Sequence, residues 1–245
     1  MANWVQLLTG EQIQAKVKKI AQALYYKFYK GSNKPVVITC ILKGASIFTT
    51  DLVRELTSII MKDYLEQVKF ADGKYYPRSS VPKIPETPSL YFIESSSYHD
   101  SQTQSKEIEI LSLIKKDKFE GRQVILVDEL CDNGKTLEVV KQYILKEVPT
   151  LTPDDVYTCV AFTKNFHPDK PRNYPLPNLT GFMVPDVWLV GYGLDNNQQL
   201  RGLNSLWAKP KAEGVPLTKP DMMFKEREYI SVYLQMLEKQ TLTYN

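Results

Sequence analysis

The sequence predicts an α/β fold with a mainly parallel central sheet flanked by helices. Three short runs of apolar and β-branched residues have the continuous character of strands buried on both faces: residues 35–42, 124–127 and 156–162. Stretches with apolar residues three or four positions apart, typical of amphipathic helices, alternate with these runs. Strands that alternate with helices form parallel sheets, whose ligands bind beyond the carboxyl ends of the strands. The residues that follow each strand are therefore the candidates for a functional site.

The first part of the chain is expected to form a helix, a strand and a second helix. Residues 12–29 predict a helix with one apolar stripe, made of Ile13, Val17, Ile20, Leu24 and Phe28. The strand at 35–42 is interrupted by Gly44, and a helix is expected over 45–61. Four prolines between residues 70 and 90 then predict an irregular insertion on the surface.

The remaining elements follow the same alternation. Strand character resumes at 90–93, whereas residues 95–105 are rich in serine and glutamine and predict a mobile loop. A polar segment separates the strand at 124–127 from a helix expected over 136–146. Two apolar runs, 182–184 and 187–190, come after the strand at 156–162.

The domain organisation follows from these elements. We expect one domain over residues 1–213, with the proline-rich insert near 70–90. Apolar residues between 219 and 240 recur at close to helical spacing, so residues 214–245 are expected to form a C-terminal helical extension.

Composition narrows the class of protein. The chain has 245 residues, 43% of them hydrophobic, which suffices for one sizeable core. A net charge of +3 gives no reason to expect a nucleic-acid partner, and no window is apolar enough for a membrane helix. Three cysteines without a CxxC pair fit neither a disulfide framework nor a zinc site. With no signal peptide, the expectation is a cytoplasmic enzyme that binds neither nucleic acid nor membrane.

The segment from Val124 to Thr136 has the pattern of a phosphate-binding turn. The strand leads into Asp128 and Glu129, and a turn at Asn133-Gly134 then opens the next helix. Backbone N–H groups and the helix dipole at such a turn attract phosphate. Gly134-Lys135-Thr136 matches the end of a P-loop, but Glu129 occupies the position of the required glycine, which excludes that motif. Two carboxylates beside the turn suit the hydroxyls of a ribose 5-phosphate.

This segment resembles the phosphoribosyl pyrophosphate motif of type I phosphoribosyltransferases. The resemblance implies the type I fold with a small hood subdomain. It also implies that Asp132 is the general acid/base facing N7 of a purine. The phosphoribosyl group would be bound by Asp128, Glu129, Asp132, Asn133, Gly134, Lys135 and Thr136. Purine-salvage members commonly have Glu-Asp where this chain has Asp128-Glu129, and threonine where it has Asn133. Both differences bear on the ribose contacts.

Two further segments resemble the same family. Leu42-Lys43-Gly44 is similar to the pyrophosphate loop, in which the Leu–Lys peptide bond can be cis, so Lys43 and Gly44 are expected to bind pyrophosphate. Ser97-Tyr98 resembles the lid that closes over the active site and excludes water.

The purine-binding residues come from a resemblance to the hypoxanthine-guanine subfamily. Lys164 matches the lysine that donates to O6 of the base, where an adenine-specific enzyme would need an acceptor. In the segment from Gly181 to Asp195, Trp188 matches the ring that stacks on the purine, and the Leu189 backbone matches the group that reads its edge. Asp195, in the same purine-binding segment, matches a magnesium ligand, and Arg201 matches the arginine that holds pyrophosphate.

The resemblance therefore implies a purine-salvage enzyme. It would transfer the phosphoribosyl group from phosphoribosyl pyrophosphate to N9 of a 6-oxopurine, with Mg²⁺ as cofactor, and would form a homodimer or homotetramer. Two alternatives remain open at this stage. One is a preference for xanthine, because backbone and water near Leu189 to Asp195 read the 2-substituent. The other is a catalytically inactive regulator with the same fold.

Overall fold

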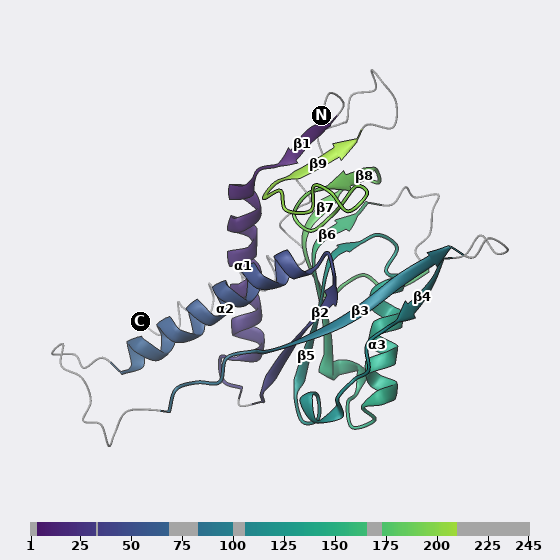
Figure 1. Ribbon diagram of the computed structural model, residues 1–245. Helices are drawn as coiled ribbons and strands as arrows, with labels where there is room; N and C mark the ends of the chain where they lie inside the picture. Colours follow the sequence, from purple (N-terminus) through teal and green to yellow (C-terminus); the bar gives the residue numbers. More distant parts are fainter. Residues whose placement is uncertain (1–3, 33, 69–82, 100–105, 166–172, 210–245) are drawn as a thin grey trace.

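The computed structural model describes residues 4–32, 34–68, 83–99, 106–165 and 173–209, and its centre is a six-stranded sheet (Figure 1). The strand order is β4-β3-β2-β5-β6-β7, with β4 antiparallel to its neighbour and the other strands parallel. The bounds are β2 Val36–Leu42, β3 Ser89–His99, β4 Lys106–Ile110, β5 Gln123–Cys131, β6 Val156–Lys164 and β7 Leu179–Val184.

Helices cover both faces of this sheet. They are α1 (Gly10–Phe28), α2 (Ser46–Gln67) and α3 (Lys135–Glu147), with two 3-10 turns, η1 (Lys116–Lys118) and η2 (Pro153–Asp155). Val36 and Ile38 pack in one core cluster with α1 and α2, whereas Val37 and Ile41 pack in a second cluster with α3. The central strands are therefore buried on both faces, which explains their continuous apolar sequences.

A second, smaller sheet lies beyond the carboxyl ends of β6 and β7 (Figure 1). Its three antiparallel strands, in the order β1-β9-β8, are β1 Val5–Leu8, β9 Leu206–Lys209 and β8 Trp188–Val190. Chain segments from the two ends of the described sequence thus meet over the central sheet, as expected for a hood subdomain.

Most elements predicted from the sequence are confirmed. The helices predicted over 12–29, 45–61 and 136–146 form α1, α2 and α3, with α2 extending to Gln67 rather than ending near residue 61. The strands predicted at 35–42, 90–93, 124–127 and 156–162 form β2, β3, β5 and β6, and the two later apolar runs lie in β7 and β8. No helix in the described part of the chain is both long and apolar enough to cross a membrane.

The prediction of a mobile loop over residues 95–105 is wrong where the structure describes it. Ser95 to His99 continue β3 and pair with Lys106 to Ile110 in an antiparallel ribbon. Backbone hydrogen bonds hold such a ribbon at a sheet edge, so its side chains need to bury little. Residues 100–105 lie outside the described residues, as do 69–82 of the proline-rich insert and the whole of the expected extension at 214–245.

Candidate active site

The carboxyl edge of the central sheet brings together residues from four segments of the chain. The loop after β2 carries Lys43 and Gly44, the end of β5 carries Asp128 and Glu129, and Lys164 is the last residue of β6. The turn after β5 leads into α3, and the segment after β8 reaches over the same edge. Parallel strands end at one edge, which is why these distant residues meet.

The Leu42–Lys43 peptide bond is cis, as the resemblance had suggested. Lys43 is exposed and Gly44 is buried. A β-carbon at Gly44 would overlap the carboxylate of Glu129, so the loop after β2 packs directly on that side chain. Gly193 packs from the other side against the carbonyl of Gly44 and lies near Glu129. The loop after β2, the end of β5 and the segment after β8 therefore meet at Gly44 and Gly193.

Asp128 and Glu129 form a desolvated acidic pair. Asp128 is buried, and its Oδ1 accepts a hydrogen bond of 2.9 Å from the backbone N–H of Glu129. Burial raises the pKa of Asp128 well above its usual range, and the charge of Glu129 raises it further. Burial also raises the pKa of Glu129, an effect that the hydrogen bond with Asp128 and the guanidinium of Arg201 oppose. Such a pair favours a ligand that donates hydrogen bonds to it, as a vicinal diol does.

The turn that precedes α3 has the geometry expected of a phosphate site. Gly134 occupies the N-cap position with φ of +94°, in the left-handed region that favours glycine. The Oδ1 atom of Asn133 accepts a hydrogen bond of 2.9 Å from the backbone N–H of Lys135, which fixes the turn. Thr136 follows in the first turn of the helix and is partly buried. The positive end of the α3 dipole points into this turn.

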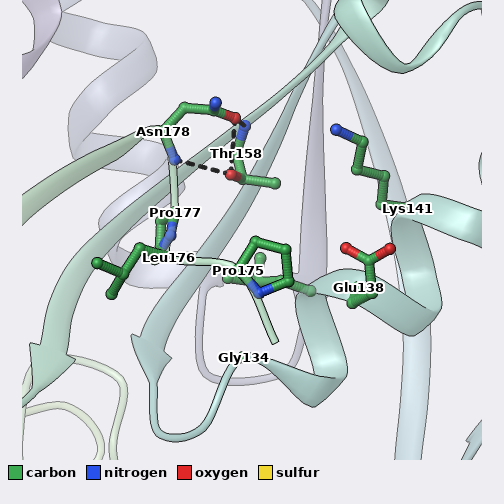
Figure 2. Close-up of a pocket in the computed structure, with 9 residues that line it drawn as sticks. Gly134, Glu138, Lys141, Thr158, Pro175, Leu176, Pro177 and Asn178 are labelled. Atoms are coloured by element: carbon green, nitrogen blue, oxygen red, sulfur yellow. Dashed lines mark hydrogen bonds between the residues drawn. The ribbon is translucent and has the colours of Figure 1, made fainter. Parts of the chain in front are cut away.

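A hollow lies behind the turn, between α3 and the segment that leads into β7, and Figure 2 shows how its walls are built. Thr158 and Asn178 close one side through three hydrogen bonds of 2.8–2.9 Å. The carbonyl of Pro175 and Cβ of Tyr174 would lie 3.0 and 3.1 Å from a β-carbon at Gly134. The hollow is lined by Gly134, Leu137, Glu138, Lys141, Thr158, Pro175, Leu176, Pro177 and Asn178. Apart from Gly134 it shares no residue with the predicted site, so we regard it as support for the turn.

Lys164 joins two carboxylates. Its Nζ lies 3.3 Å from Oδ2 of Asp132 and 3.5 Å from Oδ1 of Asp186. Only 14% of the lysine side chain is exposed, against 61% for Asp132. An ammonium held beside an exposed carboxylate can present a donor and an acceptor to neighbouring atoms of one ligand. Asp186 lies in the segment from Gly181 to Asp195, but the sequence assigned it no role.

The strand β8 and the segment after it hold the remaining predicted residues. Trp188 is 58% exposed although it is a large apolar side chain, whereas Leu189 is buried and pairs with Ala208 of β9. Arg201 forms an ion pair with Asp195 and also donates to the carbonyl of Gly193. The second carboxylate oxygen of Asp195 accepts from the backbone N–H of Gln198 at 2.8 Å.

These features can be compared with known protein families. The model of the family described as the phosphoribosyl transferase domain matches residues 3–197. The chain belongs to this family.

Two bacterial phosphoribosyltransferases and one solved structure illustrate the relationship. The hypoxanthine-guanine phosphoribosyltransferase of Aquifex aeolicus is 29% identical over 201 residues, which cover 82% of this chain and 92% of the relative. The hypoxanthine phosphoribosyltransferase of Escherichia coli is 26% identical over 209 residues, covering 83% and 94%. The hypoxanthine phosphoribosyltransferase of Trypanosoma cruzi in complex with the product IMP gives a TM-score of 0.60 at 24% identity, covering 84% and 94%. These similarities agree with the type I phosphoribosyltransferase fold.

Nearly all the predicted site residues of this phosphoribosyltransferase lie at the carboxyl edge of the sheet. Ser97 and Tyr98 lie beyond this edge, in the carboxyl-terminal part of β3 that extends past its pairing with β2, and their side chains are outside the described residues. Their assignment to a lid stays a prediction. The sequence assigned no role to Asp186, Asp51 or Tyr192, although Asp186 lies 3.5 Å from Lys164 and the Tyr192 hydroxyl donates to Asp51 at 2.9 Å. Asp186 and Tyr192 lie inside the recognised segment, whereas Asp51 carries no sequence signal.

Proposed function

We propose that this phosphoribosyltransferase transfers the 5-phosphoribosyl group from phosphoribosyl pyrophosphate to N9 of hypoxanthine or guanine, with xanthine as a further candidate base, and releases pyrophosphate. The observation that carries the proposal is the pair formed by Lys164 and Asp132, with Nζ and Oδ2 3.3 Å apart. A 6-oxopurine has an acceptor at O6 next to a nitrogen, N7, that exchanges a proton. The ammonium of Lys164 can donate to O6 while the neighbouring carboxylate of Asp132 faces N7. The relatives, named for hypoxanthine or hypoxanthine and guanine, support this choice of base.

The proposed mechanism divides the site into a sugar half and a base half. The turn from Asp132 to Thr136 binds the 5′-phosphate, and Asp128 and Glu129 accept hydrogen bonds from the ribose hydroxyls. The bond between C1′ and the pyrophosphate oxygen breaks as N9 attacks C1′, and the nearby carboxylates favour the positive charge that develops on the ribose. Lys43, Gly44 and Arg201 bind the departing pyrophosphate.

The base half orients the purine and manages its proton. Trp188 stacks on the purine, a contact worth about 1–3 kcal/mol for an aromatic ring against a base. The Leu189 backbone reads the edge of the base, and Lys164 donates to O6. Asp132 accepts or returns the proton at N7 as general base or acid. No covalent nucleophile is required.

Mg²⁺ fits this site as a cofactor held mainly by the substrate. Within the described residues no group of three or more His, Cys, Asp or Glu side chains is arranged to hold a metal. Asp195 is the carboxylate on the pyrophosphate side, and Mg²⁺ typically binds one or two protein carboxylates together with phosphate oxygens and water. When bound, Mg²⁺ would neutralise the negative charge of the pyrophosphate.

The first test is a turnover assay with four bases. Purified protein is incubated with phosphoribosyl pyrophosphate and Mg²⁺, and hypoxanthine, guanine, xanthine and adenine are offered separately while ultraviolet difference spectra follow nucleotide formation. We expect turnover with hypoxanthine or guanine and none with adenine, and loss of turnover when EDTA removes the metal. Faster turnover with xanthine than with the other bases would replace our choice of substrate. Binding of the sugar pyrophosphate without turnover of any base would indicate the regulator.

We also propose that the protein self-associates as a homodimer or homotetramer through the face of β3 opposite α3. Leu90 and Phe92 are 45% and 48% exposed there, while Tyr91 and Ile93 pack on the α3 side. Adjacent exposed apolar side chains on a sheet face typically mark a protein contact. Phe92→Lys is expected to reduce the mass measured by size exclusion with light scattering to that of the monomer. Leu113→Lys, at a site already 87% exposed, should leave the mass unchanged. Equal masses for the two variants would contradict the proposal.

The cysteines support our proposal of a cytoplasmic location. Cys40, Cys131 and Cys159 are free thiols and all three are buried. Burial raises the pKa of Cys40 to about 11, so this thiol stays protonated and unreactive at neutral pH. A reducing compartment preserves such thiols.

A further inference from the structure

Tyr192 lies in the loop that carries the proposed pyrophosphate-side residues, yet it is buried in the core. Its side chain is 1% exposed, and its backbone has φ of +48°, a conformation that residues other than glycine rarely adopt. Its ring packs near Phe48 of α2 and Phe162 of β6, with centroid separations of 6.4 and 6.1 Å. The loop is therefore anchored below the site rather than resting on its surface.

The hydroxyl group of Tyr192 ends on a carboxylate of α2. It donates a hydrogen bond of 2.9 Å to Oδ2 of Asp51, and the amide of Gln14 from α1 donates to the same oxygen at 2.6 Å. Burial and the neighbouring charge of Asp51 raise the pKa of the Tyr192 hydroxyl, so it remains a donor at neutral pH. This contact links residues 141 positions apart in the sequence.

The residue after Tyr192 touches both halves of the proposed pyrophosphate site. Gly193 packs against the carbonyl of Gly44 in the cis loop, and its own carbonyl accepts from the guanidinium of Arg201. Its N–H donates to the carbonyl of Arg201 at 3.0 Å, while the N–H of Tyr192 donates to Leu203 at 2.8 Å. A shift of the Tyr192 side chain would therefore be passed to Arg201 through a single residue.

We propose that Tyr192 and Asp51 are positioning residues that hold Arg201 and Asp195 over the Lys43–Gly44 loop, and so set the affinity for phosphoribosyl pyrophosphate and pyrophosphate. The inference rests on the proposed function of these residues. Asp51 lies in the second turn of α2, the helix that begins directly after this loop. The hydrogen bond between Tyr192 and Asp51, called the tether below, therefore fixes one side of the pyrophosphate site relative to the other. The proposed purine donor Lys164 pairs with Asp132 and Asp186, and binding of the purine should be unchanged.

The test compares Tyr192→Phe with a matched variant, Tyr143→Phe. Tyr143 of α3 also donates through its hydroxyl, to the carbonyl of Ser112 at 3.1 Å, but lies away from the site. We expect Tyr192→Phe to raise KM for phosphoribosyl pyrophosphate and Kd for pyrophosphate by about tenfold, the loss typical of one hydrogen bond to a charged group. KM for the base should change by less than about twofold, within the spread of independent sites. Tyr143→Phe should change neither constant.

Variants of Asp51 test the same contact without altering the tyrosine. Asp51→Asn keeps an acceptor oxygen, so its KM for phosphoribosyl pyrophosphate should be close to that of the wild-type protein. Asp51→Leu removes the acceptor and should raise this KM at least as much as Tyr192→Phe does. A merely structural role predicts a different pattern, a lower Tm with unchanged or equally changed KM for both substrates, and that pattern would overturn the proposal.

Arg201→Ala separates failure of this inference from failure of the site assignment. If Arg201→Ala leaves KM for phosphoribosyl pyrophosphate unchanged, the proposed pyrophosphate site is wrong, and so is the positioning role of Tyr192 and Asp51. If Arg201→Ala raises that KM and Tyr192→Phe does not, the site assignment stands and the tether alone is wrong.

Discussion

Asp132→Asn is expected to lower kcat by about 10²–10⁴-fold, the usual contribution of a general acid or base. The amide keeps the shape of the carboxylate and one acceptor oxygen, but it does not accept a proton from N7. Asp132 is 61% exposed and sits at the turn rather than in the core, so the substitution should leave the fold intact. KM for phosphoribosyl pyrophosphate should stay within about threefold, because the phosphate cradle is mainly backbone. Steady-state kinetics with hypoxanthine would measure both constants.

Asp186→Asn is the control for this experiment. Asp186 lies 3.5 Å from the same Nζ of Lys164, so each substitution removes one negative charge beside the lysine. Only Asp132 is proposed to face N7, and Asp186→Asn should therefore lower kcat far less. Near-normal turnover of Asp132→Asn, or equal losses in the two variants, would remove Asp132 from the proton-transfer role.

Gly193→Ala is expected to raise KM for phosphoribosyl pyrophosphate by about tenfold or more. A residue with a side chain at a strained backbone position costs roughly 1–3 kcal/mol, and a loss of this size in binding energy corresponds to such a change. Gly193 has φ of +103°, and a β-carbon there would overlap the carbonyl of Gly44 and lie 3.5 Å from Cβ of Glu129. Backbone has to move to admit the methyl group, and the moving groups are the cis loop and the acidic pair. Tm should fall by several degrees, about 2–4 °C for each kcal/mol in a protein of this size.

Gly202→Ala is a matched control in the same loop. A β-carbon at Gly202 meets nothing within 4 Å, and its backbone does not occupy the left-handed region. We expect unchanged Tm and unchanged KM for both substrates. If Gly193→Ala behaves like Gly202→Ala in kinetics and thermal unfolding, the contact between the two loops has no part in binding.

The local features of this protein were determined by its sequence. Runs such as 124–127 are apolar at every position because both faces of β5 are buried, and that pattern is local. The turn at Asn133-Gly134 was predictable because glycine at a left-handed N-cap is a local requirement. The placement of Asp128 and Lys43 at one edge followed from a general rule for parallel sheets. The roles of Lys164 at O6 and of Asp132 at N7 came only from family resemblance, and the contact between these residues, 32 positions apart, appears only in the folded structure.

The tertiary structure decided what depends on contacts between distant segments. The serine-rich strand end at Ser95 to His99 has no apolar pattern, because its backbone pairs with β4 at the edge of the sheet. The four-residue strands β1 and β9 form because residues near 5 and 207 are brought together. In the sequence Asp51 is an ordinary helix residue, and only the fold places it where it accepts a hydrogen bond from Tyr192. Likewise, only the fold brings Gly193 into contact with Gly44. Local propensity depends on neighbouring residues in the sequence, whereas these contacts depend on residues that come together only when the chain folds.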